Sequence, residues 1–260
     1  MIENPGPMMQ LSDRLQAMAD RVPLGDRMAD IGTDHGHLPV YLFEREHSPF
    51  VVMTDISAPS LEKAKRAAGA YQFGGGMSFR LGSGLEVLEP GEVDTVVIAG
   101  MGGKLIRDIL SADPEKTRSY SRFVLQPRTA AGALRKWLLE AGFRIFSEDI
   151  VEEGHFFPEV ITAGKKENRV LDSRDLAEMH RGILAGLSED HIFFRVPPWI
   201  ARAGGPVEKY LLRRLDQERR VREGLQAARE QDGMRINAIQ ENILYLEKLL
   251  KQVRAGQQPG

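Results

Sequence analysis

Residues 30–39 (DIGTDHGHLP) combine acids, glycines and histidines at a spacing suited to ligand binding. Gly32, Asp34 and Gly36 form a Gly-x-Asp-x-Gly pattern, which differs from the Gly-x-Gly-x-x-Gly loop of dinucleotide-binding proteins. Glycine lets the backbone approach a ligand closely, and a following helix offers free N–H groups. Asp30, two residues before Gly32, supplies a negative charge that suits the ammonium group of S-adenosylmethionine. This ligand has no pyrophosphate that the carboxylate would repel. The pattern therefore predicts a loop for S-adenosylmethionine, with an ordinary tight turn as the alternative interpretation.

A second acid, Asp55, comes 23 residues after Gly32, at the end of an apolar run. A carboxylate in this place accepts hydrogen bonds from ribose hydroxyls. The alternative is that Asp55 only caps the helix that follows Ser57. Because the two acids occur together at this separation, the ribose interpretation is favoured, and Ile56 is included in the predicted cofactor site.

Residues 82–85 (Gly-Ser-Gly-Leu) follow another apolar run and predict an adenine pocket. Leu85 is expected against the face of the base, and Ser83 is expected to make a polar contact. Gly-Ser-Gly is common in ordinary loops, so this interpretation depends on the neighbouring acids.

Two further runs end in residues suited to the acceptor side of a transfer reaction. Residues 99–103 (AGMGG) hold three glycines, which keep the loop slim enough for a bulky acceptor. Gln126, Pro127 and Arg128 end the next run, where side chains point into the same crevice of a parallel sheet. The residues of these two runs that are predicted to act on the acceptor are Gly100, Met101, Gln126 and Pro127.

No metal site is predicted. His35 and His37 stand two apart in a turn-to-helix segment, where their side chains diverge, and no carboxylate cluster accompanies them. The 260 residues include no cysteine, which excludes disulfides and Cys-ligated zinc and fits the cytoplasm. No apolar run reaches the roughly 18 residues of a membrane span, and residues 1–10 lack a basic-then-apolar leader.

These motifs need strands that end at one edge of a sheet. Non-alternating apolar runs predict buried parallel strands over 27–32, 50–55, 77–81, 93–99 and 122–126. Helical patterns between them cover 37–45, 57–71, 104–110 and 129–141. This alternation predicts a doubly wound α/β sheet.

After Gly142 the pattern changes to two β-rich runs, 143–151 and 156–163, which predict an antiparallel hairpin. Five parallel strands followed by a hairpin is the order of class I methyltransferases. A nicotinamide-binding fold would continue with a helix and a parallel strand instead.

From residue 166 the chain is predicted to be an all-α domain, so the expected domains are 1–165 and 166–260. A helix is expected over 170–187, and two long helices over 207–230 and 234–254. In the last, six apolar residues follow the 3-4 spacing of a coiled coil: Ile236, Ile239, Ile243, Leu246, Leu250 and Val253. The preceding helix is less regular, because the charged residues Arg214 and Glu218 stand where the same spacing would place apolar residues. We predict a helical hairpin that packs against itself in a monomer, with a dimerisation coil as the alternative.

At these motifs the chain resembles the bacterial tRNA (adenine-22-N1)-methyltransferase family. The matching segments cover the first 165 residues in order: LSDRL (11–15), DIGTDHGHLP (30–39), GSGLEV (82–87), IAGMGG (98–103), LQP (125–127) and EEGHFFPEV (152–160). The pair Asp34-His35 inside the glycine loop, together with IAGMGG, is unusual among methyltransferases.

The resemblance implies a class I fold that methylates N1 of adenine 22 in the D-arm region of tRNA and releases S-adenosylhomocysteine. It implies that Asp34 lies beside the target base. The predicted cofactor-binding residues are Asp30, Gly32, Thr33, Gly36, His37, Asp55, Ile56, Gly82, Ser83, Gly84, Leu85 and Ala99.

Three positions depart from the family pattern. Family members usually carry Asp at Ser83, Asn at Arg128 and Tyr at His37. Two alternatives therefore stay open: a noncatalytic RNA-binding protein with a decayed cofactor site, and a methyltransferase acting on another RNA or on a small molecule.

Charge is divided unevenly along the chain. Residues 1–165 hold 18 Lys and Arg against 23 Asp and Glu, and residues 166–260 hold 17 against 14. Five arginines crowd the first long helix: Arg213, Arg214, Arg219, Arg220 and Arg222. This helix is predicted either to present a solvated charged face or to contact RNA.

Overall fold

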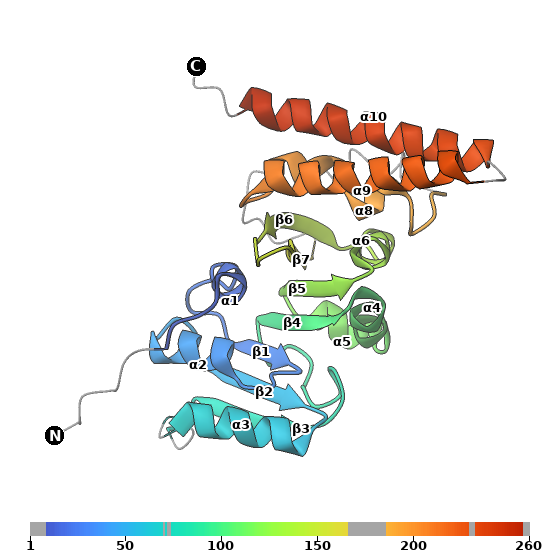
Figure 1. The fold of residues 1–260 in the computed structure, drawn as a ribbon. Helices are drawn as coiled ribbons and strands as arrows, with labels where there is room; N and C mark the ends of the chain where they lie inside the picture. Colours follow the sequence, from blue (N-terminus) through green and yellow to red (C-terminus); the bar gives the residue numbers. More distant parts are fainter. Residues whose placement is uncertain (1–8, 70, 72–73, 166–185, 229–231, 257–260) are drawn as a thin grey trace.

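A seven-stranded sheet forms the centre of the computed structural model, which describes residues 9–69, 71, 74–165, 186–228 and 232–256 (Figure 1). The strands are β1 (Met28–Ile31), β2 (Val51–Asp55), β3 (Met77–Leu81), β4 (Thr95–Gly102), β5 (Arg122–Thr129), β6 (Arg144–Ile150) and β7 (Glu159–Gly164). Their order is β3-β2-β1-β4-β5-β7-β6, with β1 to β5 parallel and β7 antiparallel to both β5 and β6. The predicted doubly wound sheet with a terminal antiparallel hairpin is confirmed.

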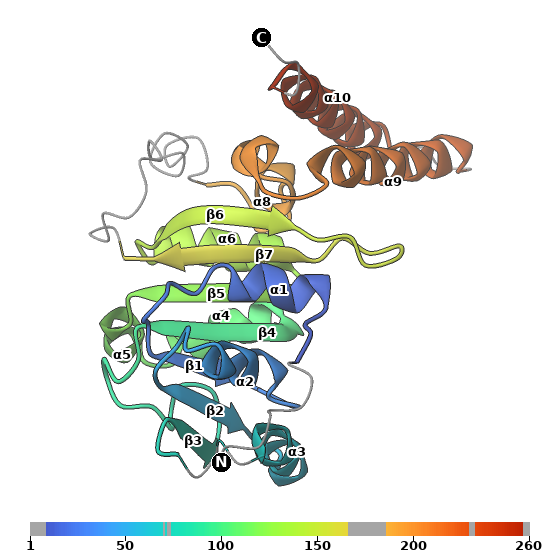
Figure 2. The same ribbon diagram turned by 90° about the vertical axis from the view of Figure 1, so that its left-hand side faces the viewer.

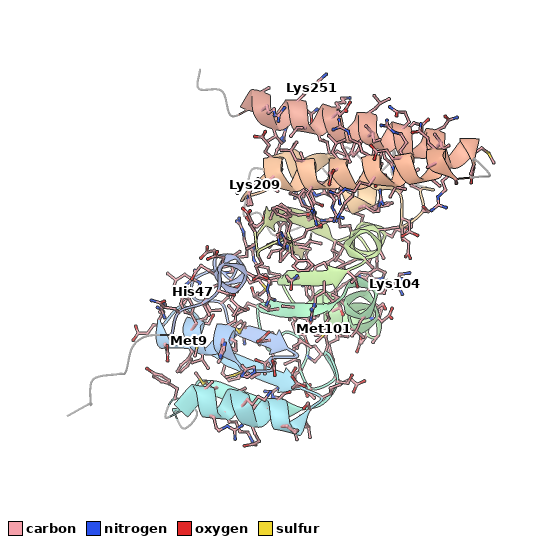
Figure 3. All side chains as sticks on the ribbon, viewed as in Figure 1. Met9, His47, Met101, Lys104, Lys209 and Lys251 are labelled. Carbon is pink, nitrogen blue, oxygen red and sulfur yellow. The ribbon has the colours of Figure 1, made fainter. Side chains whose placement is uncertain are left out.

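Helices cover both faces of the sheet (Figure 1). One face carries α1 (Asp13–Ala19), α2 (His37–Glu44) and α3 (Ala58–Ala68), and the other carries α4 (Gly103–Ser111), α5 (Pro114–Ser119) and α6 (Ala131–Glu140). Figure 3 shows Met9 and His47 on the side of α1 and α2, and Lys104 on the side of α4. Neighbouring residues of β4 face opposite layers, because Val97 packs under α2 whereas Ile98 packs under α4.

Two predictions about this part of the chain need correction. The fourth and fifth strands do not end at Ala99 and Gln126, because a bulge at Gly100 lets the pairing resume from Met101 to Gly102. The short helices α1 and α5 were not predicted. Each is capped by a side chain, since Ser12 accepts a hydrogen bond from the Leu15 N–H and Asp113 accepts one from the Lys116 N–H.

The C-terminal part consists of helices at the β6 edge of the sheet (Figure 2). They are α8 (Ile192–Arg195), the 3-10 helix η2 (Pro198–Arg202), α9 (Val207–Ala227) and α10 (Gly233–Gly256). The helix predicted over 170–187 lies almost wholly outside the described residues. In the part of the chain that the structure describes, no helix is both long and apolar enough to cross a bilayer.

Helices α9 and α10 form a hairpin and pack side by side (Figures 1 and 2). Ile243, Leu246, Leu250 and Val253 of α10 are buried, as the apolar spacing predicts. Two polar residues of α9 take the inward positions of the same register. Glu218 is buried and pairs with Arg195 of α8, and Arg214 pairs with Glu159 of β7. These polar residues therefore hold the hairpin against the rest of the protein.

A buried ionic network joins the C-terminal helices to the sheet. Arg135 of α6 is fully buried and donates hydrogen bonds to Glu148 of β6, at 3.0 and 2.6 Å, and to Glu159. Trp199 of η2 donates to Glu148 at 2.7 Å, and Tyr210 of α9 donates to Glu159 at 2.9 Å. Burial by itself raises the pKa of Glu159, but Arg135 and Arg214 hold that pKa below its ordinary value. Glu159 therefore stays ionised.

We expect Arg135→Met to lower the free energy of unfolding by about 3–5 kcal/mol, because it leaves buried Glu148 without its cation and leaves buried Glu159 with Arg214 alone. Urea unfolding measures the change. Arg219→Met is the matched control, since it removes an exposed ion pair with Glu247 and should cost at most about 1 kcal/mol. Equal losses in the two variants would show that the network does not stabilise the fold.

Candidate active site

A cavity of about 610 Å³ opens at the carboxyl ends of β1, β2 and β4. Ligands of parallel α/β sheets bind at this edge, and the volume is that of a small-molecule site. The predicted residues that line it are Asp30, Gly32, Thr33, Asp34, His37, Asp55, Ile56, Gly82, Ser83, Gly84, Ala99, Gly100 and Met101. Four predicted residues are not among them: Gly36, Leu85, Gln126 and Pro127.

The loop after β1 is held close to β2 by its backbone. The N–H groups of Gly32 and Thr33 both donate to the Thr54 carbonyl, at 2.8 and 2.9 Å. Gly32 has φ +76°, and a Cβ there would collide with the Met101 side chain. Gly36 has φ +69° and packs against Ala64, so its role is to let α2 begin here rather than to line the cavity.

Asp30 lies at the base of the cavity and is 7% exposed. The Thr33 hydroxyl donates to its carboxylate at 2.8 Å, and no cationic side chain among the described residues pairs with it. Burial raises the pKa of Asp30 from 3.8 to about 6, although the Thr33 hydrogen bond opposes the shift. A ligand cation at this place would supply the missing counter-charge.

Asp55 and Asp34 are connected across the mouth of the cavity. The Asp55 carboxylate accepts hydrogen bonds from the N–H groups of Asp34, at 3.2 Å, and Ser57, at 2.8 Å. Both interpretations of Asp55 are therefore compatible with the structure, because Asp55 orders the start of α3 and also lines the cavity. The Asp34 side chain is 59% exposed at the rim, 3.5 Å from both His35 Nε2 and Lys63 Nζ.

The far end of the cavity has an apolar wall, but Leu85 does not contribute to it. Leu85 is 5% exposed and packs in the core under α4, because the turn that joins it to Leu88 directs both side chains inward. Ile56, which is 76% exposed, lines the cavity with Leu105 and Ile109 of α4. Prediction missed the α4 residues, whose position depends on how that helix packs.

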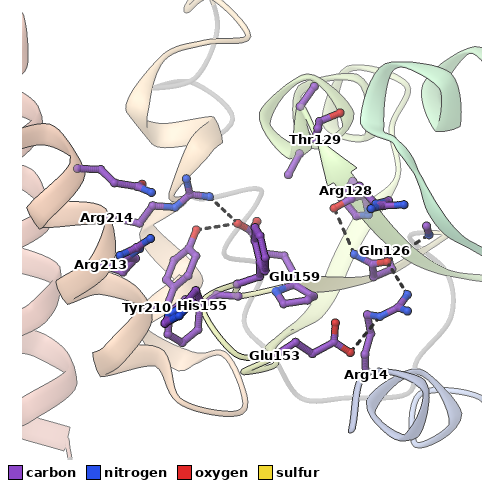
Figure 4. A pocket seen from close by; sticks show the side chains of 18 residues that line it. Arg14, Gln126, Arg128, Thr129, Glu153, His155, Glu159, Tyr210, Arg213 and Arg214 are labelled. Atoms are coloured by element: carbon purple, nitrogen blue, oxygen red, sulfur yellow. Dashed lines mark hydrogen bonds and ion pairs between the residues drawn. The ribbon is translucent and has the colours of Figure 1, made fainter. Parts of the chain in front are cut away.

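A second cavity, of about 790 Å³, adjoins the first and lies between the end of β5, the β6–β7 loop and α9 (Figure 4). Gln126 and Pro127 line this cavity instead of the first. Three residues line both cavities: Arg14, Gly100 and Arg128. The two cavities therefore meet at the bulge of β4.

Gln126 organises this junction. Its side-chain oxygen accepts hydrogen bonds from the Gly100 N–H and from Arg14 Nη1, both at 3.1 Å, and its amide nitrogen donates to the Pro127 carbonyl at 3.3 Å. Gln126 is 2% exposed. These bonds show that Gln126 shapes the bulge. They also occupy the side-chain oxygen of a residue that was predicted to act on the acceptor.

Several lining residues were not predicted. Arg14 of α1 lies in the segment LSDRL, which contributed to the family resemblance but was assigned no role in the site. Tyr210 reaches the second cavity from α9 and was not predicted. Arg213 and Arg214, which were named as candidates for a solvated face or RNA contact, reach it from the same helix, and no local pattern in the sequence could connect them to β5. Among the described residues no group of three or more His, Asp or Glu side chains is arranged to hold a metal.

Residues 11–161 match the family model of the methyltransferase domain. The chain belongs to this family. It is 38% identical over 155 residues to the Bacillus subtilis tRNA (adenine(22)-N(1))-methyltransferase, a match that covers 60% of this chain and 65% of that protein. The chain thus spans less than two thirds of the length of this curated relative.

Two crystal structures extend the similarity of this chain to the C-terminal helices. The Bacillus subtilis tRNA methyltransferase TrmK superposes with a TM-score of 0.70 at 28% identity, covering 95% of this chain and 98% of that one. A Streptococcus pneumoniae protein in complex with S-adenosyl-L-methionine gives 0.70 at 25% identity, covering 93% and 100%.

We expect Asp30→Asn to stabilise the ligand-free protein, and to do so more at high pH. Because the folded pKa of Asp30 is raised, its destabilising effect is absent below the unfolded value of 3.8 and complete above about 6. Urea unfolding at about pH 4 and about pH 8 should show a gain that grows by up to about 3 kcal/mol between them. The exposed Asp108→Asn is the control. A gain that does not grow with pH would contradict the assigned burial penalty.

Proposed function

We propose that the protein transfers a methyl group from S-adenosylmethionine to N1 of an adenine in tRNA, adenine 22 in the numbering of its relatives. The observation that carries the proposal is the junction at Gly100, where a cavity with acidic residues meets a second cavity lined by four arginines. The names of the Bacillus subtilis relatives support the same substrate.

The first cavity suits the cofactor on the chemistry of its residues. Buried Asp30 has no cationic partner among the described residues and would bind the methionine ammonium. Asp55 would accept hydrogen bonds from the ribose hydroxyls. Exposed Ile56 offers an apolar surface for the adenine, with Ser83 beside it. When bound, the cofactor supplies an electrophilic methyl group.

The target adenine would enter at the junction. N1 of neutral adenine already carries a lone pair, so the residues need to orient it and exclude water rather than remove its proton. Gly100 and Met101 leave room beside the cofactor cavity, and Asp34 would stabilise the positive charge that develops on the base or accept the N6 proton. Because N1 lies on the Watson–Crick edge, the adenine must be unpaired first.

The domain assignment follows from this division of roles. We propose that residues 1–165 bind the cofactor and carry out the transfer, and that residues 166–260 support tRNA binding. The packing of α9 against α10 within one chain supports the predicted monomer.

Mass spectrometry of unmodified tRNA incubated with the protein and S-adenosylmethionine tests the function. We expect 1-methyladenosine at a single position in the D-arm region. Methylation at another position, or of another RNA only, would overturn the assignment of the substrate. Absence of cofactor binding in calorimetry would support the decayed-site alternative, which the departures at Ser83 and Arg128 suggest.

We expect Asp34→Asn to reduce kcat by about 10²–10³-fold, the typical contribution of one charge-stabilising or proton-accepting group, and to leave cofactor affinity unchanged. Single-turnover methylation and calorimetry measure the two effects. Asp108→Asn, an exposed acid on α4, is the matched control. Full turnover by Asp34→Asn with normal cofactor binding would exclude the proposed role.

A further inference from the structure

From the junction at Gly100 the second cavity extends toward α9 as a groove whose residues have no role in the proposed transfer reaction. We call it the α9 groove, and its walls are Arg128 of β5, His155 and Phe156 of the β6–β7 loop, and Tyr210, Arg213 and Gln217 of α9. Figure 4 shows Arg128 and Arg213 on opposite sides of it.

Two of the four arginines around the second cavity carry uncompensated charge. Arg14 pairs with Glu153 and Arg214 pairs with Glu159, so both acids of the cavity are already bound to cations. Arg128 and Arg213 are exposed, and neither forms an ion pair with any residue that the structure describes. The α9 groove therefore presents two guanidinium groups that are available to an anion.

Phe156 is a large aromatic side chain that is 76% exposed, yet its backbone is held in place. Phe156 and Glu153 exchange backbone hydrogen bonds at 2.9 and 3.0 Å, and Arg14 holds the Glu153 carboxylate at 3.2 Å. The next residue, Phe157, packs edge-on against Tyr210 with ring centroids 6.2 Å apart. An exposed ring on an ordered turn offers a flat surface on which a base can stack.

We propose that the α9 groove binds the nucleotide next to the target adenine, with its base on Phe156 and its flanking phosphates on Arg128 and Arg213. This inference rests on the proposed function. If the target adenine occupies the junction at Gly100, the RNA chain must continue from it, and the groove is the adjoining space. Fixed aromatic rings and unpaired arginines are the groups that recognise unstacked nucleotides and their phosphates.

The proposal has a structural consequence for the substrate. A target that is flipped out alone would fill only the junction, whereas a target with its neighbour unstacked would fill both the junction and the groove. The enzyme is therefore expected to prefer tRNA in which two consecutive nucleotides leave the stack. Helix α9 then belongs to the acceptor site, because Arg213 provides one of its walls.

Binding of tRNA to the full-length protein, measured by fluorescence anisotropy across a salt series with S-adenosylhomocysteine present, tests the groove. The logarithm of the binding constant falls as the logarithm of the salt concentration rises. Each of Arg128→Gln and Arg213→Gln should reduce the steepness of this fall by about one, and the double variant should reduce it by about two. Phe156→Ala should weaken binding by about tenfold without changing the slope, and Phe156→Trp should retain it. Arg213→Lys keeps the positive charge and should therefore retain the salt dependence of the unmodified protein.

Matched controls are Arg66→Gln on α3, at the opposite edge of the sheet, and Leu24→Ala in the segment before β1, another exposed apolar residue. Neither lines either of the two cavities described above, and both variants should bind tRNA as the unmodified protein does. Thermal unfolding and calorimetric cofactor affinity confirm that each variant is folded.

The outcomes separate the two proposals. If the unmodified protein transfers no methyl group to tRNA, the proposed function fails. If it methylates tRNA but the groove variants behave like their controls, only the groove assignment is overturned. A reduced salt slope for the arginine variants and an unchanged slope for Phe156→Ala support it.

Discussion

The fully buried guanidinium of Arg135 is the group on which the arrangement of the two halves depends. It sits between carboxylates of two adjacent strands, and those carboxylates also bind Trp199 and Tyr210 from the C-terminal helices. A buried cation with two anions tolerates few other geometries, because each unpaired charge would be costly. Tyr210 and Arg214, at the edge of this network, also form the wall of the second cavity. The contacts that dock α9 thus position one side of the acceptor site.

A second constraint lies at the bulge of β4. Gly100 has φ +74°, and its N–H is held by Gln126, which in turn is held by Arg14 of α1. One buried amide therefore connects three segments that are far apart in sequence. The bulge separates the cavity proposed for the cofactor from the groove proposed for the RNA, yet leaves them open to each other. This geometry suits a transfer between a small cationic molecule and a large polyanion.

The distribution of charge follows the same division. Acids concentrate where an ammonium and a ribose would bind, and uncompensated arginines concentrate where phosphates would bind. The small net charge of −2 conceals this division, because most of the arginines on α9 outside the groove are neutralised locally, as Arg219 is by Glu247 and Arg220 by Asp216. Both interpretations of the arginine-rich helix are therefore compatible with the structure. Arg219 and Arg220 belong to a solvated charged face, whereas Arg213 is available to RNA.

The sequence by itself determined the features that depend on short-range chemistry. Strand–helix alternation, the hairpin, and the loop from Asp30 to Gly36 follow from local period, glycine conformation and the order of residues along each strand. Only the tertiary structure decided which side chains converge from distant segments. Leu85 turns into the core, Gln126 shapes a bulge, and Arg14 and Arg213 meet at one cavity because α1 and α9 pack at opposite sides of the β5 end. Such convergence depends on packing across more than a hundred residues, and no local pattern records it.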